Sequence, residues 1–217
     1  MFVLIIDYGS GNIKSVYNSV KKTLQSYDKF AKIKVSSNLV EIKKADKIIL
    51  PGVGSFDQCM NRIRKINDLV ETLNYHIITI KKPFLGICVG MQILADYGYE
   101  NRKTKGLSWI NGNVKSLKNF TDHSQNLKIP HMGWNNLIIN RENNLLKNIT
   151  FDDQFYFVHS YFFDIKNNKN IICNTQYGMN IPAIVNEDNI FGFQFHPEKS
   201  GRSGLKILYN WLKKVNE

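Results

Sequence analysis

The sequence predicts an α/β protein in which helices flank a central, mostly parallel mixed sheet, with additional antiparallel strands in the C-terminal half. Over the first half of the chain, short apolar runs alternate with helical patterns, which is typical of parallel sheets covered by helices. In the second half, short apolar runs follow one another, separated by Asn, Gly, Asp and Lys. The length of 217 residues suits one core, so we expect residues 1–217 to form a single domain.

The first half is expected to build the parallel part of the sheet. Residues 2–6 are a continuous apolar run, the pattern of a strand buried on both faces. A helix is predicted from Asn12, a good N-cap residue, to about residue 24. Apolar residues at helical spacing predict one long helix over residues 55–80. The remaining strands of this half are predicted at residues 33–35, 47–50 and 84–87.

The second half is expected to supply the antiparallel strands and a last helix. Its short apolar runs are bounded by turn-forming residues, which favours strands over helices. Strands are predicted at residues 109–110, 113–117, 137–139, 155–158, 171–174, 184–185 and 191–195. An amphipathic helix is predicted from residue 204 to about residue 215.

Composition narrows the functional classes. Hydrophobic content of 43% and aromatic content of 12% are ordinary for a globular protein. The net charge of +11 comes from lysines spread along the chain, with only five arginines, so we expect no nucleic-acid partner. No apolar stretch is long enough to span a bilayer, and residues 1–6 lack the basic start of a secretory signal. Three widely separated cysteines suggest neither a disulfide framework nor a metal site, so we expect a cytoplasmic protein without a metal.

Cys88 lies between a predicted strand and a predicted helix, a position at which a protein fold can make a thiol reactive. Gly86 and Gly90 stand two residues either side of Cys88, between a predicted strand and a helix starting within residues 91–95. This spacing is typical of a tight elbow that presents a nucleophile, since side chains at the two glycines would obstruct the turn. A helix N-terminus also favours thiolate over thiol. Taken alone, the pentapeptide suits a small buried cysteine equally well.

A general base is found near the end of the chain. His196 follows the apolar run at residues 190–195, and Glu198 lies two residues further on, where it can accept a hydrogen bond from the imidazole. By contrast, His76 falls in the predicted long helix and His123 in a polar loop, so we expect solvated roles for both. Together with Cys88, these residues predict a Cys-His-Glu triad.

Backbone donors for an oxyanion are predicted at a second strand end. The glycine turn at residues 51–54 follows the strand at 47–50, and Val89 follows the nucleophile, so main-chain N–H groups of both can face Cys88. Without Cys88, a plain turn before the next helix would be the preferred interpretation of residues 51–54. The glycines at positions 9 and 11 resemble a dinucleotide loop only superficially, because the third glycine is missing. We therefore expect no nucleotide cofactor.

Several of these segments together resemble the triad-type, class I glutamine amidotransferases. The shared elements are residues 51–54, 86–92 and 193–198. Further segments are similar to the branch that supplies ammonia for imidazole glycerol phosphate synthesis in the histidine pathway; these are residues 7–12, 130–135, 157–161 and 198–200. The resemblance extends from Asp7 to beyond Ser200, almost the whole chain, and it implies a class I glutamine amidotransferase-like fold.

The resemblance also implies roles for individual residues. Cys88 attacks the side-chain amide of L-glutamine, His196 moves the proton to the leaving ammonia, and Glu198 orients His196. The resulting thioester is hydrolysed to glutamate. The residues implied in holding glutamine are Gln92, Glu100, Ser160 and Tyr161. The resemblance implies that Gly52 and Val53 form the oxyanion hole, which is assembled fully only when the partner subunit holds its own ligand. No cofactor is implied.

A partner chain is implied as well. Ammonia in water near neutral pH is mostly ammonium, which has no lone pair for attack, so it must pass directly to an acceptor site. The resemblance names the partner as a (β/α)8-barrel cyclase subunit, forming a heterodimer. The residues expected at the interface are Asn12, Met132, Trp134 and Lys199. Ordinary core packing is the alternative for Met132 and Trp134.

Other functions stay open on these residues alone. A paralogous glutaminase subunit could supply ammonia for amidination of a surface-glycan sugar, because the acceptor binds to the other chain. A non-catalytic docking module and a stand-alone thiol hydrolase are further alternatives. The intact set of Cys88, His196 and Glu198 argues against the docking module, and the segments around Trp134 and Lys199 argue against the stand-alone hydrolase.

Overall fold

The main sheet carries both the parallel and the antiparallel strands that the sequence predicts. The structure is a computed structural model that describes residues 1–9, 12–119 and 127–214, so His123 lies outside the described residues. Within them, eight strands form one sheet, parallel at one end and antiparallel at the other. Their order is β2 (Lys32–Val35), β1 (Phe2–Ile5), β3 (Lys47–Gly52), β4 (Phe84–Cys88), β14 (Ile190–Phe193), β13 (Asn180–Glu187), β12 (Ile171–Gln176) and β9 (Ile138–Ile139).

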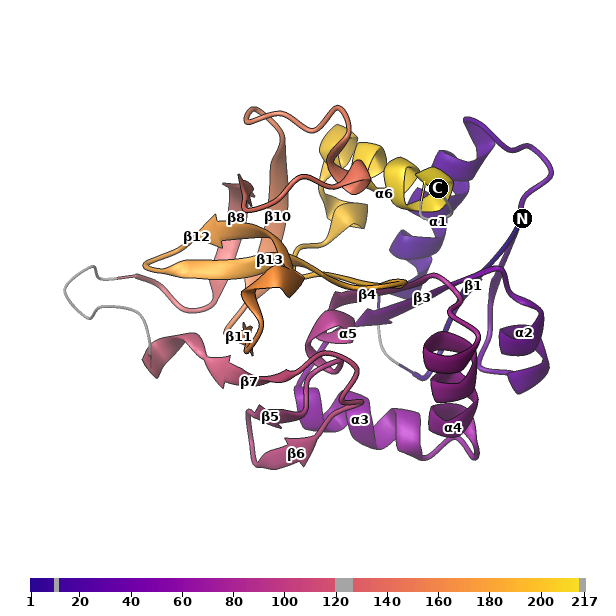
Figure 1. Cartoon of the computed structure of the whole chain (residues 1–217), viewed down its shortest axis with the longest axis horizontal. Coiled ribbons are helices and arrows are strands. Elements are labelled where there is room, and N and C mark those ends of the chain that lie inside the picture. Colours follow the sequence, from indigo (N-terminus) through magenta and orange to yellow (C-terminus); the bar gives the residue numbers. More distant parts are fainter. Residues whose placement is uncertain (10–11, 120–126, 215–217) are drawn as a thin grey trace.

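Helices cover both faces of the parallel half (Figure 1). The helices are α1 (Ile13–Gln25), α2 (Leu39–Lys44), α3 (Phe56–Arg64), α4 (Leu69–Asn74), α5 (Val89–Gln92) and α6 (Gly201–Lys214). In Figure 1, α1 and α6 lie above the sheet, while α2, α3 and α4 lie below it. The central strands β3 and β4 are fully buried, as expected for strands covered on both faces. No described helix combines the length and the apolar character needed to cross a bilayer.

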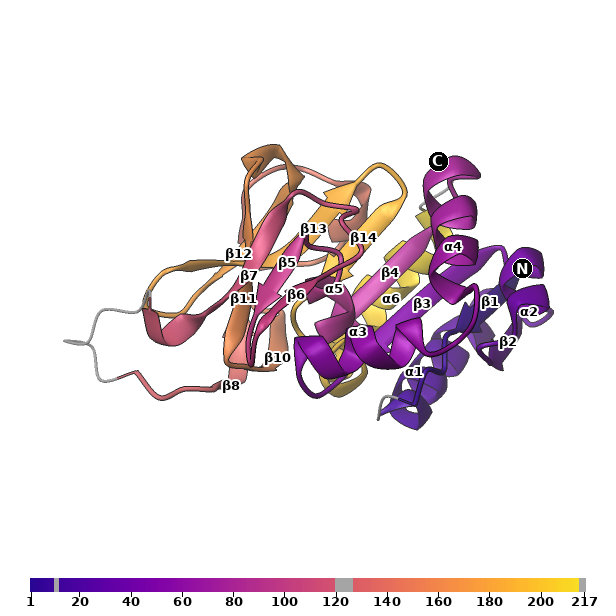
Figure 2. The same ribbon diagram turned by 90° about the horizontal axis from the view of Figure 1, so that it is seen from below.

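Two smaller sheets lie beside the antiparallel half of the main sheet, one above it and one below it in Figure 1, and Figure 2 views the molecule from below. One is ordered β11 (Tyr161–Ile165), β7 (Gly112–Ser116), β5 (Tyr97–Tyr99) and β6 (Lys103–Lys105), and the other pairs β10 (Gln154–His159) with β8 (His131–Asn136). Short single-turn helices connect several of these elements; they are η1 (Tyr75–Thr79), η2 (Leu117–Asn119), η4 (Asn144–Leu146), η5 (Asn168–Asn170) and η6 (Pro197–Lys199).

Three predicted elements differ in the structure. The single helix predicted over residues 55–80 is two helices, α3 and α4, followed by the π-helical turn η1, because Asp68 takes a left-handed conformation that an α-helix cannot contain. The strand predicted at 109–110 is wrong: the amides of Trp109 and Ile110 both donate to the Leu94 carbonyl rather than to a strand. The helix predicted to start within residues 91–95 spans only Val89–Gln92.

The cap prediction at Asn12 is confirmed for the position but not for the side chain. Asn12 does occupy the position before α1, but its φ of 69° is left-handed and its side chain caps nothing. The side-chain amide instead donates a hydrogen bond to Glu198. The residue is therefore held by a contact 186 positions away in sequence, which local helix rules do not describe.

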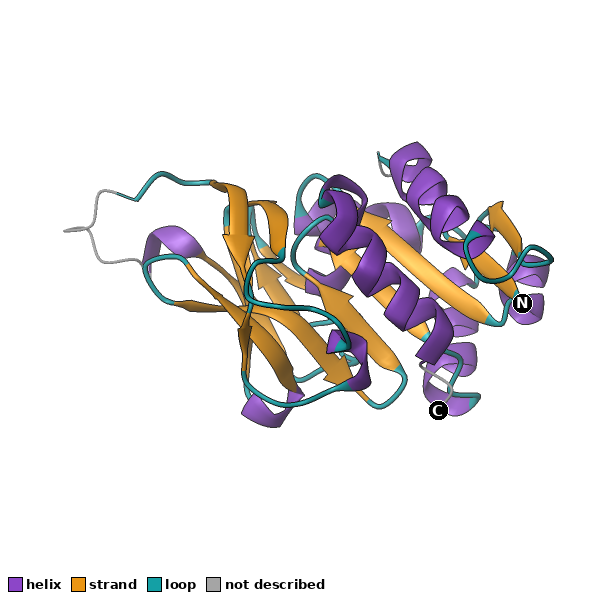
Figure 3. Cartoon of the chain, turned by 90° about the horizontal axis from the view of Figure 1, so that it is seen from above, coloured by secondary structure: helices purple, strands orange, loops and turns teal. Residues whose placement is uncertain are grey.

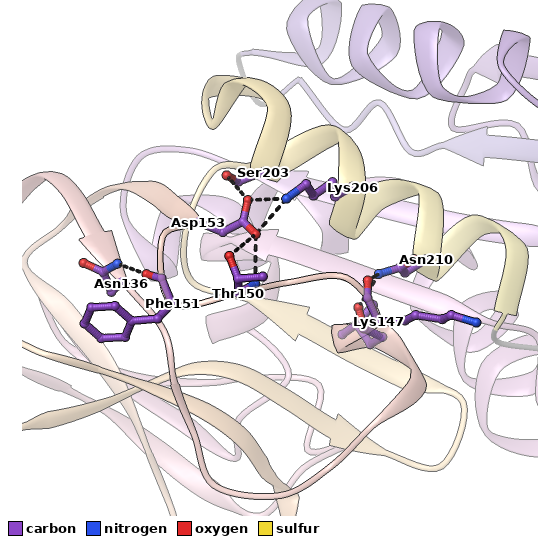
Figure 4. A network of polar contacts seen from close by, with 9 residues as sticks. Asn136, Lys147, Thr150, Phe151, Asp153, Ser203, Lys206 and Asn210 are labelled. Carbon is purple, nitrogen blue, oxygen red and sulfur yellow. Dashed lines mark hydrogen bonds and ion pairs between the residues drawn. The ribbon is translucent and has the colours of Figure 1, made fainter.

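Helix α6 is anchored to the segment that precedes β10 (Figures 3 and 4). The carboxylate of Asp153 is nearly buried and accepts hydrogen bonds from Ser203 at 2.7 Å and Lys206 at 2.8 Å. One turn further, the amide of Asn210 donates to the carbonyls of Leu145 and Lys147. Because α6 begins directly after η6, these contacts also fix the turn that carries Glu198.

Candidate active site

The nucleophile elbow has the geometry that its glycines predict. Cys88 ends β4 with φ 56° and ψ −112°, a conformation that L-residues rarely adopt and that turns the sulfur out of the strand. A Cβ atom at Gly86 would lie 2.3 Å from the carbonyl oxygen of Gly90, and one at Gly90 would lie 2.0 Å from that of Leu50. No side chain fits at either glycine, so the elbow depends on both.

The imidazole and carboxylate come from the neighbouring strand. β14 runs parallel to β4, so the chain leaving its carboxyl end brings His196 to the same sheet edge as Cys88. His196 Nδ1 lies 2.7 Å from Glu198 Oε1, and both side chains are almost fully buried. Two hydrogen bonds fix the strand exit: the His196 amide donates to the Tyr156 carbonyl at 2.9 Å, and Ser200 Oγ donates to the His196 carbonyl at 2.6 Å.

His196 is held in its charged form. Burial by itself lowers the pKa of His196, but hydrogen bonds to Cys88 and Glu198 and the charges of these two groups outweigh burial and raise the pKa to about 10. With Nδ1 engaged by Glu198, the hydrogen bond to Cys88 belongs to the other ring nitrogen. At neutral pH the imidazole is therefore an imidazolium beside sulfur, which is an acid placed to protonate a leaving group.

The segment predicted to form the oxyanion hole lies against the elbow. Gly52 pairs with Cys88 between β3 and β4, and a Cβ atom at Gly52 would lie 2.4 Å from the amide nitrogen of Gly90. Val53 and Val89 line the cavity into which Cys88 opens. The structure thus brings all three predicted oxyanion residues to the nucleophile.

The cavity itself has a volume of about 330 Å³, enough for an amino acid. Of the residues predicted to hold glutamine, Gln92, Glu100, Ser160 and Tyr161 all line it. Burial is the main cause of a raised pKa at Glu100, although this carboxylate accepts a hydrogen bond from the Phe56 amide at 2.7 Å. Its negative charge contributes to the raised pKa of Tyr161, for which burial is the larger cause.

The side chain of Gln92 also makes hydrogen bonds within the protein. Its side-chain nitrogen donates to the Tyr161 carbonyl at 2.9 Å and to Gln194 Oε1 at 3.0 Å. Gln194 in turn donates toward the sulfur of Cys88 at 3.9 Å. Sequence reasoning missed Gln194, which lies just beyond the end of β14 and two residues before His196.

A second missed feature is a pair of buried histidines beside the cavity. His159 Nδ1 donates to the Tyr161 carbonyl at 2.9 Å, so His159 Nε2 accepts from His131 Nδ1 at 3.0 Å. Asn135 donates to the remaining nitrogen of His131. Burial, and for His159 the charge of its neighbour, lowers the pKa values to about 4 for His131 and about 3 for His159, so both are neutral. They fix the chain beside the cavity rather than carry a charge.

The residues expected at a partner interface occupy two positions. Lys199 lines the cavity, whereas Asn12 lies behind the triad on Glu198. Met132 and Trp134 are on β8 with exposed fractions of 61% and 54%, which excludes core packing for both. Trp134 and Lys199 both contact one ring: the indole meets Tyr156 edge-on at 5.9 Å, and Lys199 Nζ lies 5.6 Å from the centre of the same ring.

Comparison with known proteins assigns the family. The model of the family "Glutamine amidotransferase class-I" matches residues 4–215. The chain belongs to the class-I glutamine amidotransferases. It is similar to "Imidazole glycerol phosphate synthase subunit HisH" of Pelagibacter ubique, with 49% identity over 98% of this chain and 99% of that protein. The protein of the same name from Methanocaldococcus jannaschii is 41% identical over 96% of this chain and 97% of its own length.

Within the class-I amidotransferases, the chain therefore belongs to the HisH branch, the glutaminase subunits of imidazole glycerol phosphate synthase. The fold agrees with this assignment. A glutamine amidotransferase from Thermotoga maritima superposes with a TM-score of 0.70 over 100% of this chain and 98% of that one, at 16% sequence identity. The predicted fold class is thereby confirmed.

Proposed function

We propose that Cys88, His196 and Glu198 are the triad through which this glutaminase subunit hydrolyses L-glutamine. The observation that supports this is their arrangement at one sheet edge, with Cys88 and His196 lining a cavity and Glu198 bonded behind the imidazole. The sulfur attacks the side-chain amide carbon, and the carbonyl electrons move to oxygen. Gly52, Val53 and Val89 offer backbone N–H groups to that oxygen.

The second half of the reaction releases the two products. His196 gives its proton to the amide nitrogen, the carbon–nitrogen bond breaks, and ammonia leaves a thioester on Cys88. Water then adds to the thioester carbon, with His196 taking a proton from it, and glutamate departs as the sulfur is restored. The sum is glutamine and water giving glutamate and ammonia.

The acceptor of ammonia is proposed to be a second chain. HisH is named as a subunit of imidazole glycerol phosphate synthase, which implies a partner subunit. We propose a (β/α)8-barrel cyclase in a heterodimer, docked over Met132 and Trp134, with Lys199 at the cavity mouth. The exposure of both β8 residues supports this location, since exposed Met and Trp are enriched at interfaces.

Two structural features support the proposals of a single domain and of a cytoplasmic location. One hydrophobic core contains residues from Val3 to Leu212, as expected if residues 1–217 fold as one domain. The three cysteines are buried and free, which suits the reducing cytoplasm that we propose.

The deciding experiment measures glutamate release by the purified chain alone and with the cyclase and its nucleotide substrate. We expect strong activation by the loaded partner, formation of imidazole glycerol phosphate, and a loss of at least about 10³-fold in Cys88→Ala and His196→Ala. Cys173→Ala, at a buried cysteine on β12, is the matched control. Unchanged activity in Cys88→Ala would refute the triad, and activation by a glycan-modifying partner alone would refute the acceptor.

A further inference from the structure

Two buried side chains hold the segment that faces the nucleophile. The Tyr8 hydroxyl donates a hydrogen bond to the Pro51 carbonyl at 2.8 Å. The Cys59 thiol donates to the Val53 carbonyl at 3.4 Å, an ordinary distance for a sulfur donor. The two carbonyls lie at the end of β3 and just after it, so residues 51–53 are fixed at two nearby points.

The two donors come from elements that are themselves rigid. Tyr8 follows β1, which pairs with β3, and its side chain is 4% exposed. Cys59 lies on the buried face of α3 and is 1% exposed. Neither side chain contacts the cavity, so neither can act on substrate directly.

The peptide between the two held carbonyls is the one that joins Gly52 to Val53. On its other side, Gly52 packs directly on the elbow, since a Cβ atom there would lie 2.4 Å from the Gly90 amide and 3.0 Å from the Tyr8 hydroxyl. The Gly52–Val53 peptide is therefore held between the tyrosine, the thiol and the elbow. Its N–H group, on Val53, is one of the donors proposed for the oxyanion, and Val53 lines the cavity into which Cys88 opens.

We propose that Tyr8 and Cys59 are positioning residues for the oxyanion hole. This inference rests on the proposed roles of Val53 and Cys88. A donor for the oxyanion matters only after negative charge develops on the substrate oxygen, so loss of its positioning lowers kcat and leaves KM nearly unchanged. A merely structural role would instead lower both the rate and the reactivity of the sulfur.

The first test is Tyr8→Phe, measured in the complex with the cyclase. Removing the hydroxyl keeps the ring and frees the Pro51 carbonyl, and we expect kcat to fall about 5–50-fold, less than the loss of a whole oxyanion donor. Iodoacetamide separates the two explanations: Cys88 sulfur displaces iodide and forms a sulfur–carbon bond without an oxyanion. We therefore expect the alkylation rate of Cys88, read by mass spectrometry, to stay within about twofold of wild type.

Tyr27→Phe is the matched control for the loss of a buried hydroxyl. The Tyr27 hydroxyl is buried and has no hydrogen-bond partner among the described residues, and its ring packs against Tyr209 near the end of α1. This variant should change neither kcat nor alkylation.

The second test compares Cys59→Ala with Cys59→Ser. Alanine removes the donor to the Val53 carbonyl and serine keeps one, so we expect kcat to fall about 3–10-fold in the alanine variant and to recover in the serine variant, since a sulfur donor is weak. Cys173→Ala removes a buried thiol elsewhere and serves as the control.

Each outcome decides the inference. Lower kcat with normal KM and normal alkylation, rescued by serine, supports it. Normal kcat in both Tyr8→Phe and Cys59→Ala overturns it, and so does a parallel loss of kcat and alkylation, which would mean general damage to the site. If Tyr8→Phe fails to fold, the comparison of Cys59→Ala with Cys59→Ser is decisive by itself. If the proposed function itself is wrong, the wild-type protein will show no glutaminase activity, which distinguishes that result from a failure of this inference.

Discussion

Replacing Glu198 with glutamine tests the charge that holds His196. Glu198 is 1% exposed and accepts the Nδ1 proton at 2.7 Å, and glutamine can keep this hydrogen bond while losing the charge. A hydrogen bond to a charged group contributes about 1.5–3 kcal/mol, and a neutral one contributes about 0.5–1.5 kcal/mol. The difference of about 1–1.5 kcal/mol corresponds to about one unit in the pKa of His196.

The direction of the effect follows from the pKa of His196. That pKa is raised to about 10, so the imidazolium persists through neutral pH and is lost only as pH rises through about 10. In Glu198→Gln the alkaline limb of the glutaminase profile should move down by about one unit. At neutral pH kcat should fall about 10²–10⁴-fold, because a neutral partner also weakens the hold on the ring tautomer.

The assay is kcat and kcat/KM of the complex from pH 6 to 10.5, with the charge state of His196 followed by NMR of its ring nitrogens. Glu142→Gln, which removes one carboxylate outside the site, controls for the change in net charge. An alkaline limb at the wild-type position, together with a kcat within twofold of wild type, would refute the reasoning.

Three further changes test the fold and the proposed interface. Gly52→Ala should reduce glutaminase activity severely and lower the free energy of unfolding by about 1–3 kcal/mol in urea titration, because its Cβ atom meets the Gly90 amide at 2.4 Å. Lys47 is 1% exposed, and burial lowers its pKa to about 8, partly offset by Asp46, so its charge is costly at pH 7. Lys47→Met should therefore raise the free energy of unfolding by about 1–2 kcal/mol at pH 7. This gain should shrink as pH rises from about 8 to 10.5, because Lys47 in the folded wild-type protein loses its charge over that range. An equal gain at pH 11 would count against this explanation. Trp134→Ala should weaken cyclase binding about 10-fold or more in calorimetry, without changing glutamine hydrolysis by the isolated chain; unchanged affinity would move the interface elsewhere.

The parallel core was predictable because its signals are local. The strand ending at Cys88 is a continuous apolar run with glycines at fixed spacing, and both features are visible within seven residues. His196 lies beside Cys88 because β14 pairs in parallel with β4, a contact between segments far apart in sequence. The sequence suggested this pairing only through chemistry, since a thiol at one strand end needs a base from another.

Elements with weak local signals were missed. β8 begins after Pro130 and contains Gly133 and three Asn or His residues, a composition that is depleted in strands, and its backbone is ordered by pairing with β10. β5 and β6 are three-residue strands on a sheet edge, too short for alternation to be recognised. In each case, tertiary pairing stabilises what local propensity does not predict.

The site shows the same division between local and long-range information. The nucleophile, the base and their neighbours in sequence were predicted from local signals. The contacts of Gln194 and of the buried pair His131 and His159 were not predicted, because each depends on partners far away in sequence. Asn12 was assigned to the interface by resemblance and as a cap by local rules. Its described contact is with Glu198, behind the triad.

The strand β10 connects the proposed partner face to the chemistry. Its Tyr156 contacts both Trp134 and Lys199, and the Tyr156 carbonyl accepts the His196 amide. In the proposed complex, a cyclase docked on the indole of Trp134, on β8, would be linked through Tyr156 to the strand that fixes the exit of the base from β14. Lys199 also lines the cavity, so in the proposed complex a subunit docked beside it would cover the cavity mouth. Loss of the indole should therefore disturb binding and ammonia transfer together, while hydrolysis by the isolated chain, which needs only the triad and the cavity, continues.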